Sequence, residues 1–107
     1  MKITNTELAQ LVERCFDLSM DARLNINERK DFLAIGKRLR GSLLNLLSAQ
    51  FKDNTQAVID ANNQLKVLNA KLQDTISVLQ NIAQVITQLG SLVKILDDLL
   101  KTASSFV

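Results

Sequence analysis

Apolar residues recur at alternating spacings of three and four from Val58 to Ala103, and this repeat constrains the fold more than any other feature. It covers seven heptads, in which Thr75 is the single polar residue at the core positions. Such a repeat is typical of a long helix that packs against its neighbours in coiled-coil fashion. The sequence therefore predicts one helix over about residues 54–104, and a kink at Gly90 is compatible with the pattern. Position a holds Val58, Leu65, Leu72, Leu79, Ile86, Val93 and Leu100, and position d holds Ala61, Leu68, Thr75, Ile82, Leu89, Leu96 and Ala103.

A first helix is predicted over about residues 4–23. Thr4 and Glu7 have the spacing of a capping box, in which each side chain binds the backbone NH of the other residue. Cys15 lies on the apolar stripe of this helix, so we expect it to be an inert, buried residue. The stripe contains Leu8, Leu11, Val12, Cys15, Phe16, Leu18 and Ala22.

A second helix is predicted over about residues 27–51. Asn25 and Glu28 also have capping-box spacing, at the start of this segment. Gly36 and Gly41 each lower its helix propensity by about 1 kcal/mol relative to Ala, and they indicate close helix packing or a local kink. The apolar residues of this helix are Phe32, Leu33, Ile35, Leu39, Leu43, Leu44, Leu46, Leu47 and Phe51.

The composition agrees with a fold made of helices. The chain contains no proline, and Leu, Ala, Gln and Lys prevail over the β-branched and aromatic runs that are typical of strands. An unbroken last helix would be about 75 Å long at 1.5 Å per residue. We therefore predict a single all-α domain over residues 1–107, which is an elongated three-helix bundle or long helical hairpin with coiled-coil-like packing.

The residues on which most side-chain catalysis depends are scarce. The chain has no His and one Cys, which excludes a histidine general base, an intrachain disulfide and the usual zinc sites. Glu13 and Asp17 are four residues apart and could ligate a metal, but the His of helical di-metal sites is missing. Surface charge patterning accounts for both residues. We expect a protein that is not an enzyme, with no cofactor, no metal site and no small-molecule substrate.

The charge of the chain argues against a nucleic-acid partner. The formal net charge is +2, too small to indicate nucleic-acid binding by itself. The basic residues Arg29, Lys30, Lys37, Arg38 and Arg40 fan out around a helix and form no flat stripe that could follow a phosphate backbone. They favour a solvated face, or docking to an acidic partner or to lipid headgroups.

The beginning of the sequence bears on location. Residues 3–13 mix polar and acidic groups with apolar ones and contain no continuous apolar run. A secretory signal requires such a run. We expect a cytoplasmic protein, and export without a leader stays open.

The nineteen residues from Thr75 to Val93 carry no charge and have nearly the length of a membrane span. Position g of the heptad is apolar in this part of the chain, whereas upstream it holds Gln64 and Lys71. Two adjacent apolar strips result, enough for two neighbouring helices or for a partner outside the chain. The residues predicted to bind a partner are Val78, Val85, Leu89, Leu92, Leu96 and Leu99.

Three alternatives account for this wide apolar face. In the first, it is buried against the two preceding helices of the same chain. In the second, the chain is a non-enzymatic interaction or assembly module, and the face binds a second copy in a homo-oligomer or the helix of another protein. In the third, the amphipathic helix is stored in a bundle and is released into a bilayer. The second alternative is our expectation for the function.

The third alternative also has a resemblance behind it. Over about residues 65–100, the long helix, which is uncharged from Thr75 to Val93 and rich in Ala, Ile, Val and Gln, resembles the hairpin segments of α-helical pore-forming toxins. The resemblance implies a membrane-active amphipathic protein of the α-pore-forming kind, whose amides and hydroxyls would line a water-filled path.

Overall fold

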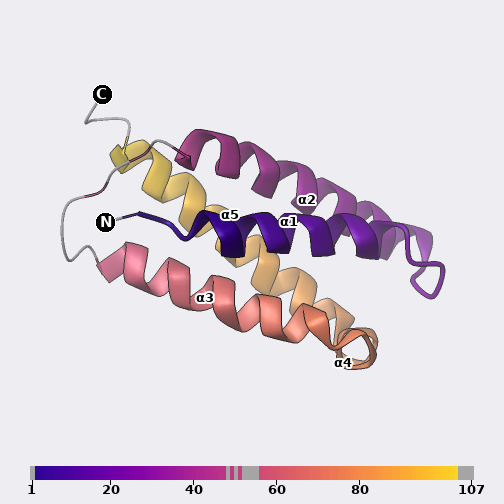
Figure 1. Cartoon of the computed structure of the whole chain (residues 1–107). Coiled ribbons are helices and arrows are strands. Elements are labelled where there is room, and N and C mark those ends of the chain that lie inside the picture. The colour runs from indigo at the N-terminus through magenta and orange to yellow at the C-terminus, as the bar shows by residue number, and fades with distance from the viewer. Residues whose placement is uncertain (1, 48, 50, 52–55, 104–107) are drawn as a thin grey trace.

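The structure is a computed structural model, and it describes residues 2–47, 49, 51 and 56–103. Every regular element among these residues is a helix, so the predicted all-α class is confirmed. The helices are α1 (Asn5–Ser19), α2 (Ile26–Leu46), α3 (Gln56–Gln73), α4 (Thr75–Gln80) and α5 (Ile82–Ala103) (Figure 1).

The four long helices form two antiparallel hairpins that pack against each other. α1 and α2 form the first hairpin, α3 and α5 form the second, and α4 turns the corner between α3 and α5 (Figure 1). Each long helix contacts two others, in the cyclic order α1, α2, α5, α3. The molecule measures 43 × 20 × 19 Å. The prediction of three helices is therefore wrong, because the described residues form a four-helix bundle with one short additional helix.

The predicted continuous helix over residues 54–104 is wrong because the chain reverses between Asp74 and Asn81. Asp74 caps α4, since its Oδ1 accepts a hydrogen bond from the backbone N of Ser77 at 3.3 Å. Asn81 ends α4, and its Nδ2 donates to the carbonyl oxygen of Ser77 at 3.1 Å. Short polar side chains that bind the nearby backbone favour caps and turns over helix interiors. Gly90 lies inside α5, which continues through it.

The first hairpin is joined by a capped turn. The predicted capping box of Asn25 and Glu28 is confirmed: Asn25 Oδ1 accepts from Glu28 N at 2.8 Å, and Glu28 Oε1 accepts from Asn25 N at 3.0 Å. Both helices are shorter than predicted. α1 ends at Ser19, whose hydroxyl donates to the carbonyl of Phe16 at 2.6 Å, and α2 ends at Leu46.

Two asparagines on α3, seven residues apart, hold the N-terminal segment in register. Asn62 Oδ1 accepts a hydrogen bond from Thr4 N at 2.8 Å, and its Nδ2 donates to the carbonyl of Lys2 at 3.1 Å. Asn69 is buried, and its Nδ2 donates to the carbonyl oxygen and the carboxylate of Glu7 at 2.7 and 2.8 Å. The predicted capping box of Thr4 and Glu7 is wrong, since Thr4 makes no side-chain cap bond. The Glu7 carboxylate binds Asn69 on the neighbouring helix instead.

α1 and α2 approach each other closely at Gly36. A Cβ atom at this position would lie 3.1 and 3.2 Å from two ring atoms of Phe16 and 3.4 Å from the Cβ of Cys15. At Gly41 and Gly90, an added Cβ would meet nothing within 4 Å. Gly36 therefore marks the close packing of two helices, whereas Gly41 and Gly90 do not.

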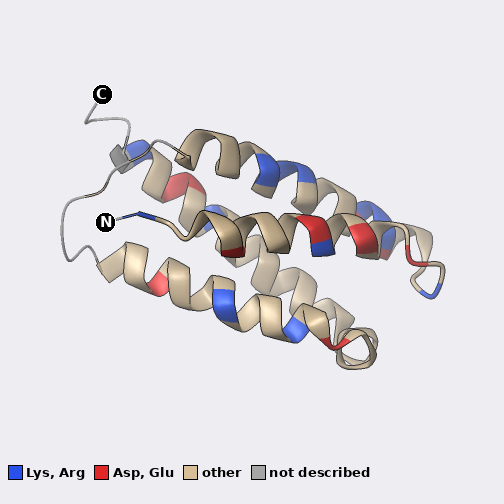
Figure 2. Ribbon diagram, in the orientation of Figure 1, with Lys and Arg blue, Asp and Glu red and all other residues tan. Residues whose placement is uncertain are grey.

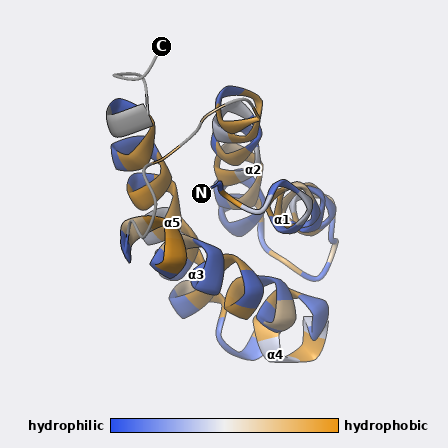
Figure 3. Ribbon diagram, turned by 60° about the vertical axis from the view of Figure 1, so that its left-hand side comes forward, coloured by the Kyte–Doolittle hydropathy of each residue, from blue (hydrophilic) through white to orange (hydrophobic). Residues whose placement is uncertain are grey.

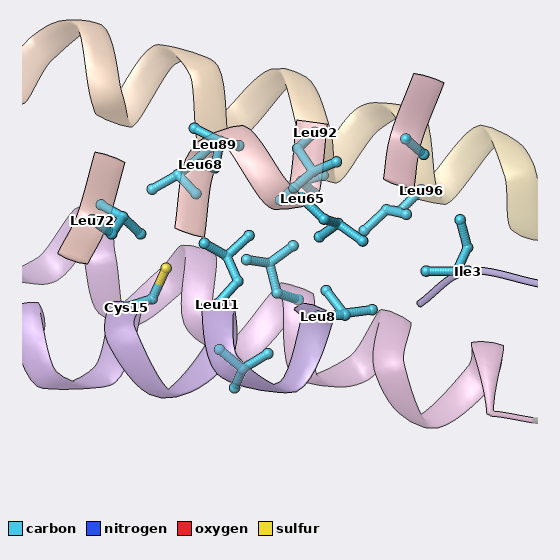
Figure 4. Packing of buried hydrophobic residues seen from close by; sticks show 14 of the residues in the cluster. Ile3, Leu8, Leu11, Cys15, Leu65, Leu68, Leu72, Leu89, Leu92 and Leu96 are labelled. Carbon is cyan, nitrogen blue, oxygen red and sulfur yellow. The ribbon is translucent and has the colours of Figure 1, made fainter. Parts of the chain in front are cut away.

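One hydrophobic core fills the space between the two hairpins. The apolar sides of the helices turn toward one another (Figure 3). Figure 4 shows side chains from three helices meeting in this core, namely Leu8, Leu11 and Cys15 of α1, Leu65, Leu68 and Leu72 of α3, and Leu89, Leu92 and Leu96 of α5.

Substitutions at the glycines test the close approach of α1 and α2. Gly36→Leu should lower the free energy of unfolding by about 1–3 kcal/mol, because the new side chain collides with Phe16. Gly41→Ala and Gly90→Ala should each raise it by up to about 1 kcal/mol through better helix propensity. Urea denaturation followed by circular dichroism measures all three. A Gly36→Leu variant as stable as the wild type would show that the two helices do not pack closely there.

Candidate association surface

The six residues predicted to bind a partner lie in the core of the folded chain. Val78 belongs to α4 and the others to α5, and their exposed fractions range from 0 to 5%. The reversal between α3 and α5 turns this strip toward the first hairpin, so the chain's own helices cover it. In the folded chain these predicted residues are therefore not accessible to a partner. They are Val78, Val85, Leu89, Leu92, Leu96 and Leu99.

A neutral groove of about 340 Å³ lies on the other side of α5, between α3 and α5. Asn63 and Val67 line it from α3, and Thr87 and Ser91 line it from α5. The hydroxyl of Thr87 donates to the carbonyl of Ala83 at 2.9 Å, and that of Ser91 donates to the carbonyl of Thr87 at 3.2 Å. These hydroxyls have partners within their own helix, and no lining residue is charged. The groove offers no ionisable group for catalysis.

Exposed apolar side chains gather on the outer side of the first hairpin instead. On α2, the exposed fractions are 64% for Leu44 and 38% for Leu33, and Leu47, which caps the end of this helix, is 50% exposed. Met20, at the end of α1, is 72% exposed. We call these four residues, together with the half-buried Phe16 between them, the outer α1–α2 face.

The geometry of Phe16 shows that these residues share one side of the hairpin. The Cζ atom of Arg40 lies 5.6 Å from the centroid of the Phe16 ring, so this flank of α2 faces α1. At 100° per residue, Leu33 and Leu44 fall within about 40° of Arg40 on the helix. Met20 follows Phe16 by four residues and therefore lies on the same side of α1.

The sequence contains a signal for this surface that a simple list of apolar residues hides. The nine apolar residues of the predicted second helix cover more than one face. Leu39 and Leu46 point into the core. On a helical wheel, Leu33, Leu44 and Leu47 lie about 80–140° from Leu39, which is outside the stripe that one core needs.

The charged residues near this face are sorted by helix. Glu13 and Asp17 are exposed on α1, and Lys30, Lys37 and Arg40 are exposed on α2. Figure 2 shows blue positions along α2 and mostly red positions along the middle of α1. Among the described residues, no group of three or more His, Cys, Asp or Glu side chains is placed to hold a metal ion.

The predicted basic cluster is divided between two sides of α2. Arg38 faces α5, where its Nη2 lies 2.9 Å from Oδ2 of Asp97. Arg40 faces α1, where it stacks on Phe16. The cluster is therefore not one continuous basic surface, and only its α1 side borders the outer α1–α2 face.

Comparisons of the chain with models of protein families, with curated proteins and with solved structures find no match. Over the described ranges, the helices are too short or too polar to cross a membrane. The membrane-active alternative stays a prediction from the sequence. The candidate surface therefore rests on the geometry and chemistry of this chain.

The prediction that Cys15 is buried is confirmed, and its burial gives stability a pH dependence. Burial raises the pKa of the Cys15 thiol from 9.0 to about 12, because the thiolate would lose its hydration. Above about pH 9 the unfolded chain releases this proton and the folded chain keeps it. Stability from this group is thus complete below pH 9 and is lost as the pH rises toward 12.

Cys15→Ala tests this dependence. The free energy of unfolding of the wild type should fall by up to about 1.4 kcal/mol per pH unit more steeply than that of the variant, over the range above pH 9. Urea denaturation of both proteins below and above pH 9 measures the difference in slope. Below pH 9 the variant is less stable than the wild type because it leaves a cavity, so only the slopes above pH 9 are compared. Equal slopes would contradict a buried, protonated thiol.

Proposed function

We propose that the chain is a non-enzymatic helical association module. Its outer α1–α2 face binds a helical surface, in the first place the same face of a second copy of the chain. The observation that carries the proposal is the band of Met20, Leu33, Leu44 and Leu47, which stays exposed although the chain has a complete core elsewhere. Large exposed apolar side chains that lie among polar and charged residues are typical of protein interfaces.

The dimensions of the molecule support this proposal. One long side of the bundle measures 43 × 20 Å, which is comparable to the roughly 800 Å² that each partner contributes to a standard interface. Full burial of a large apolar side chain contributes about 1.5–3 kcal/mol. These four side chains are 38–72% exposed, so on two copies their burial would contribute roughly 7–13 kcal/mol, which is similar to the roughly 4–15 kcal/mol that association costs.

The proposal moves the association surface from α5 to the first hairpin. The core of the bundle depends on Val85 and Leu92, which are 4% and 0% exposed. Val85→Glu combined with Leu92→Glu should therefore unfold the chain, because the folded state would bury two unpaired charges. Leu44 and Leu47 are exposed, so a charge there leaves the fold of the single chain intact.

Sedimentation equilibrium over a range of micromolar concentrations tests the proposal. The wild type should form a species heavier than 11.9 kDa. Leu44→Lys combined with Leu47→Lys should weaken this association about a hundredfold or more, because each change removes a buried side chain from the interface. The helical circular dichroism spectrum should not change.

Val67→Lys combined with Ile76→Lys is the matched control. These two side chains are 54% and 67% exposed and lie on α3 and α4, away from the first hairpin. The control variant should associate as the wild type does. A wild type that sediments as a monomer at every concentration, or a control that dissociates as readily as the Leu44 and Leu47 variant, would reject this surface.

A further inference from the structure

We propose that the outer α1–α2 face binds a second copy of the chain in one orientation, with the two-fold axis parallel to the helices, so that α1 of each copy lies over α2 of the other. This inference rests on the proposed function and adds the occupant and its orientation. It is carried by the way in which the charges are sorted between α1 and α2.

The contacts of Phe16 establish which residues of the antiparallel hairpin are level with each other. The Phe16 ring lies between Gly36, which it approaches closely, and Arg40, which stacks on it. Glu13 lies one turn before Phe16, so it is level with Arg40. By the same reasoning, Asp17 is level with Lys37.

Exposed acidic and basic groups therefore lie side by side at the same height. α1 presents Glu13 and Asp17 on this face, and α2 presents Lys37 and Arg40. A further basic residue, Lys30, is exposed nearer the turn. The face thus has one acidic edge along α1 and one basic edge along α2.

Two further basic residues of the hairpin, Arg14 and Arg38, lie on its other sides. Arg14 and Asp17 both line a pocket together with Leu72 and Thr75, on the side of α1 that faces the second hairpin. Asp17 is exposed and lies about 60° from Met20 on the helix, so it also borders the outer α1–α2 face, whereas Arg14 is half-buried. Arg38 is turned toward α5 and pairs with Asp97. Arg14 and Arg38 therefore do not alter the acidic and basic edges of the outer α1–α2 face.

A two-fold pair of such faces with parallel helix axes has two arrangements. If the axis lies in the interface and crosses the helices at a right angle, α1 lies over α1 and α2 over α2. Acidic groups then meet acidic groups, and basic groups meet basic groups, which is unfavourable. If the axis runs parallel to the helices, α1 lies over the partner's α2 and every acidic group meets a basic one. The charges select the second arrangement.

The apolar residues fit the same arrangement. An axis parallel to the helices keeps each residue at its own height, so the residues that are level within one hairpin also meet across the interface. Met20 is level with Leu33, and Ala9 is level with Leu44. The exposed side chain of Leu44 then faces the small Ala9 of the second copy, which leaves room for it.

Charge exchange tests this orientation. Glu13→Lys with Asp17→Lys, and separately Lys37→Glu with Arg40→Glu, should each weaken self-association by about tenfold or more, because like charges then meet across the interface. The four substitutions together restore opposite charges at every contact and leave the net charge at +2. The fourfold variant should therefore dimerise as well as the wild type.

Mixing the fourfold variant with the wild type distinguishes the two arrangements. With α1 over α2, mixed dimers bring like charges together, so native mass spectrometry should find the two homodimers and few mixed ones. With α1 over α1, mixed dimers are the favoured species, and finding them would overturn the orientation. Lys94→Glu, an exposed reversal on α5, should leave dimer formation and mixing unchanged.

The outcomes separate the orientation from the proposed function. A monomeric wild type rejects both. A wild type that associates, loses association on Leu44→Lys with Leu47→Lys, and is unaffected by either pair of charge reversals keeps the association surface and rejects the orientation. Circular dichroism checks that every charge variant is folded under the conditions of the association measurement, which we expect because these positions are exposed.

Discussion

The reversal of the chain between Asp74 and Asn81 is the constraint on which the rest of the structure depends. An unbroken helix with the heptad of residues 58–103 would need partners along its whole length, and α1 and α2 are too short to supply them. Folding back at α4 lets α5 return along α3. The apolar side of α5 then meets the first hairpin, and one core results.

The helical class, the capping box of Asn25 and Glu28 and the burial of Cys15 could be predicted from the sequence, because each depends on local spacing. The reversal could not be predicted from the heptad, since apolar spacing continues through it. Its signal is polar: Thr75, the one polar core position, directly follows the helix cap Asp74, and Asn81 is nearby. The heptad does not reveal this break, because of the three polar residues only Thr75 occupies a core position of the repeat.

The predicted partner surface differs from the candidate surface for the same reason. On an isolated helix, nothing covers the wide apolar strip of α5. Because the chain reverses at α4, the first hairpin covers this strip, and Leu92 and Leu96 are core residues. Leu44 and Leu47 lie on a helix whose core side is already filled by Leu39 and Leu46. Only the arrangement of all four long helices shows which apolar residues are left over. That is why tertiary packing, and not hydrophobicity alone, locates the candidate surface.

The distance between the start of α3 and the end of α5 tests the reversal most directly. Spin labels on cysteines introduced at the exposed positions Gln56 and Asp98, in a Cys15→Ala background, can be measured by double electron–electron resonance. Ala57 and Asp98 line one pocket, so we expect a distance close to the 20 Å width of the molecule. A distance near 63 Å, which is about 1.5 Å for each residue of an unbroken helix, would contradict it.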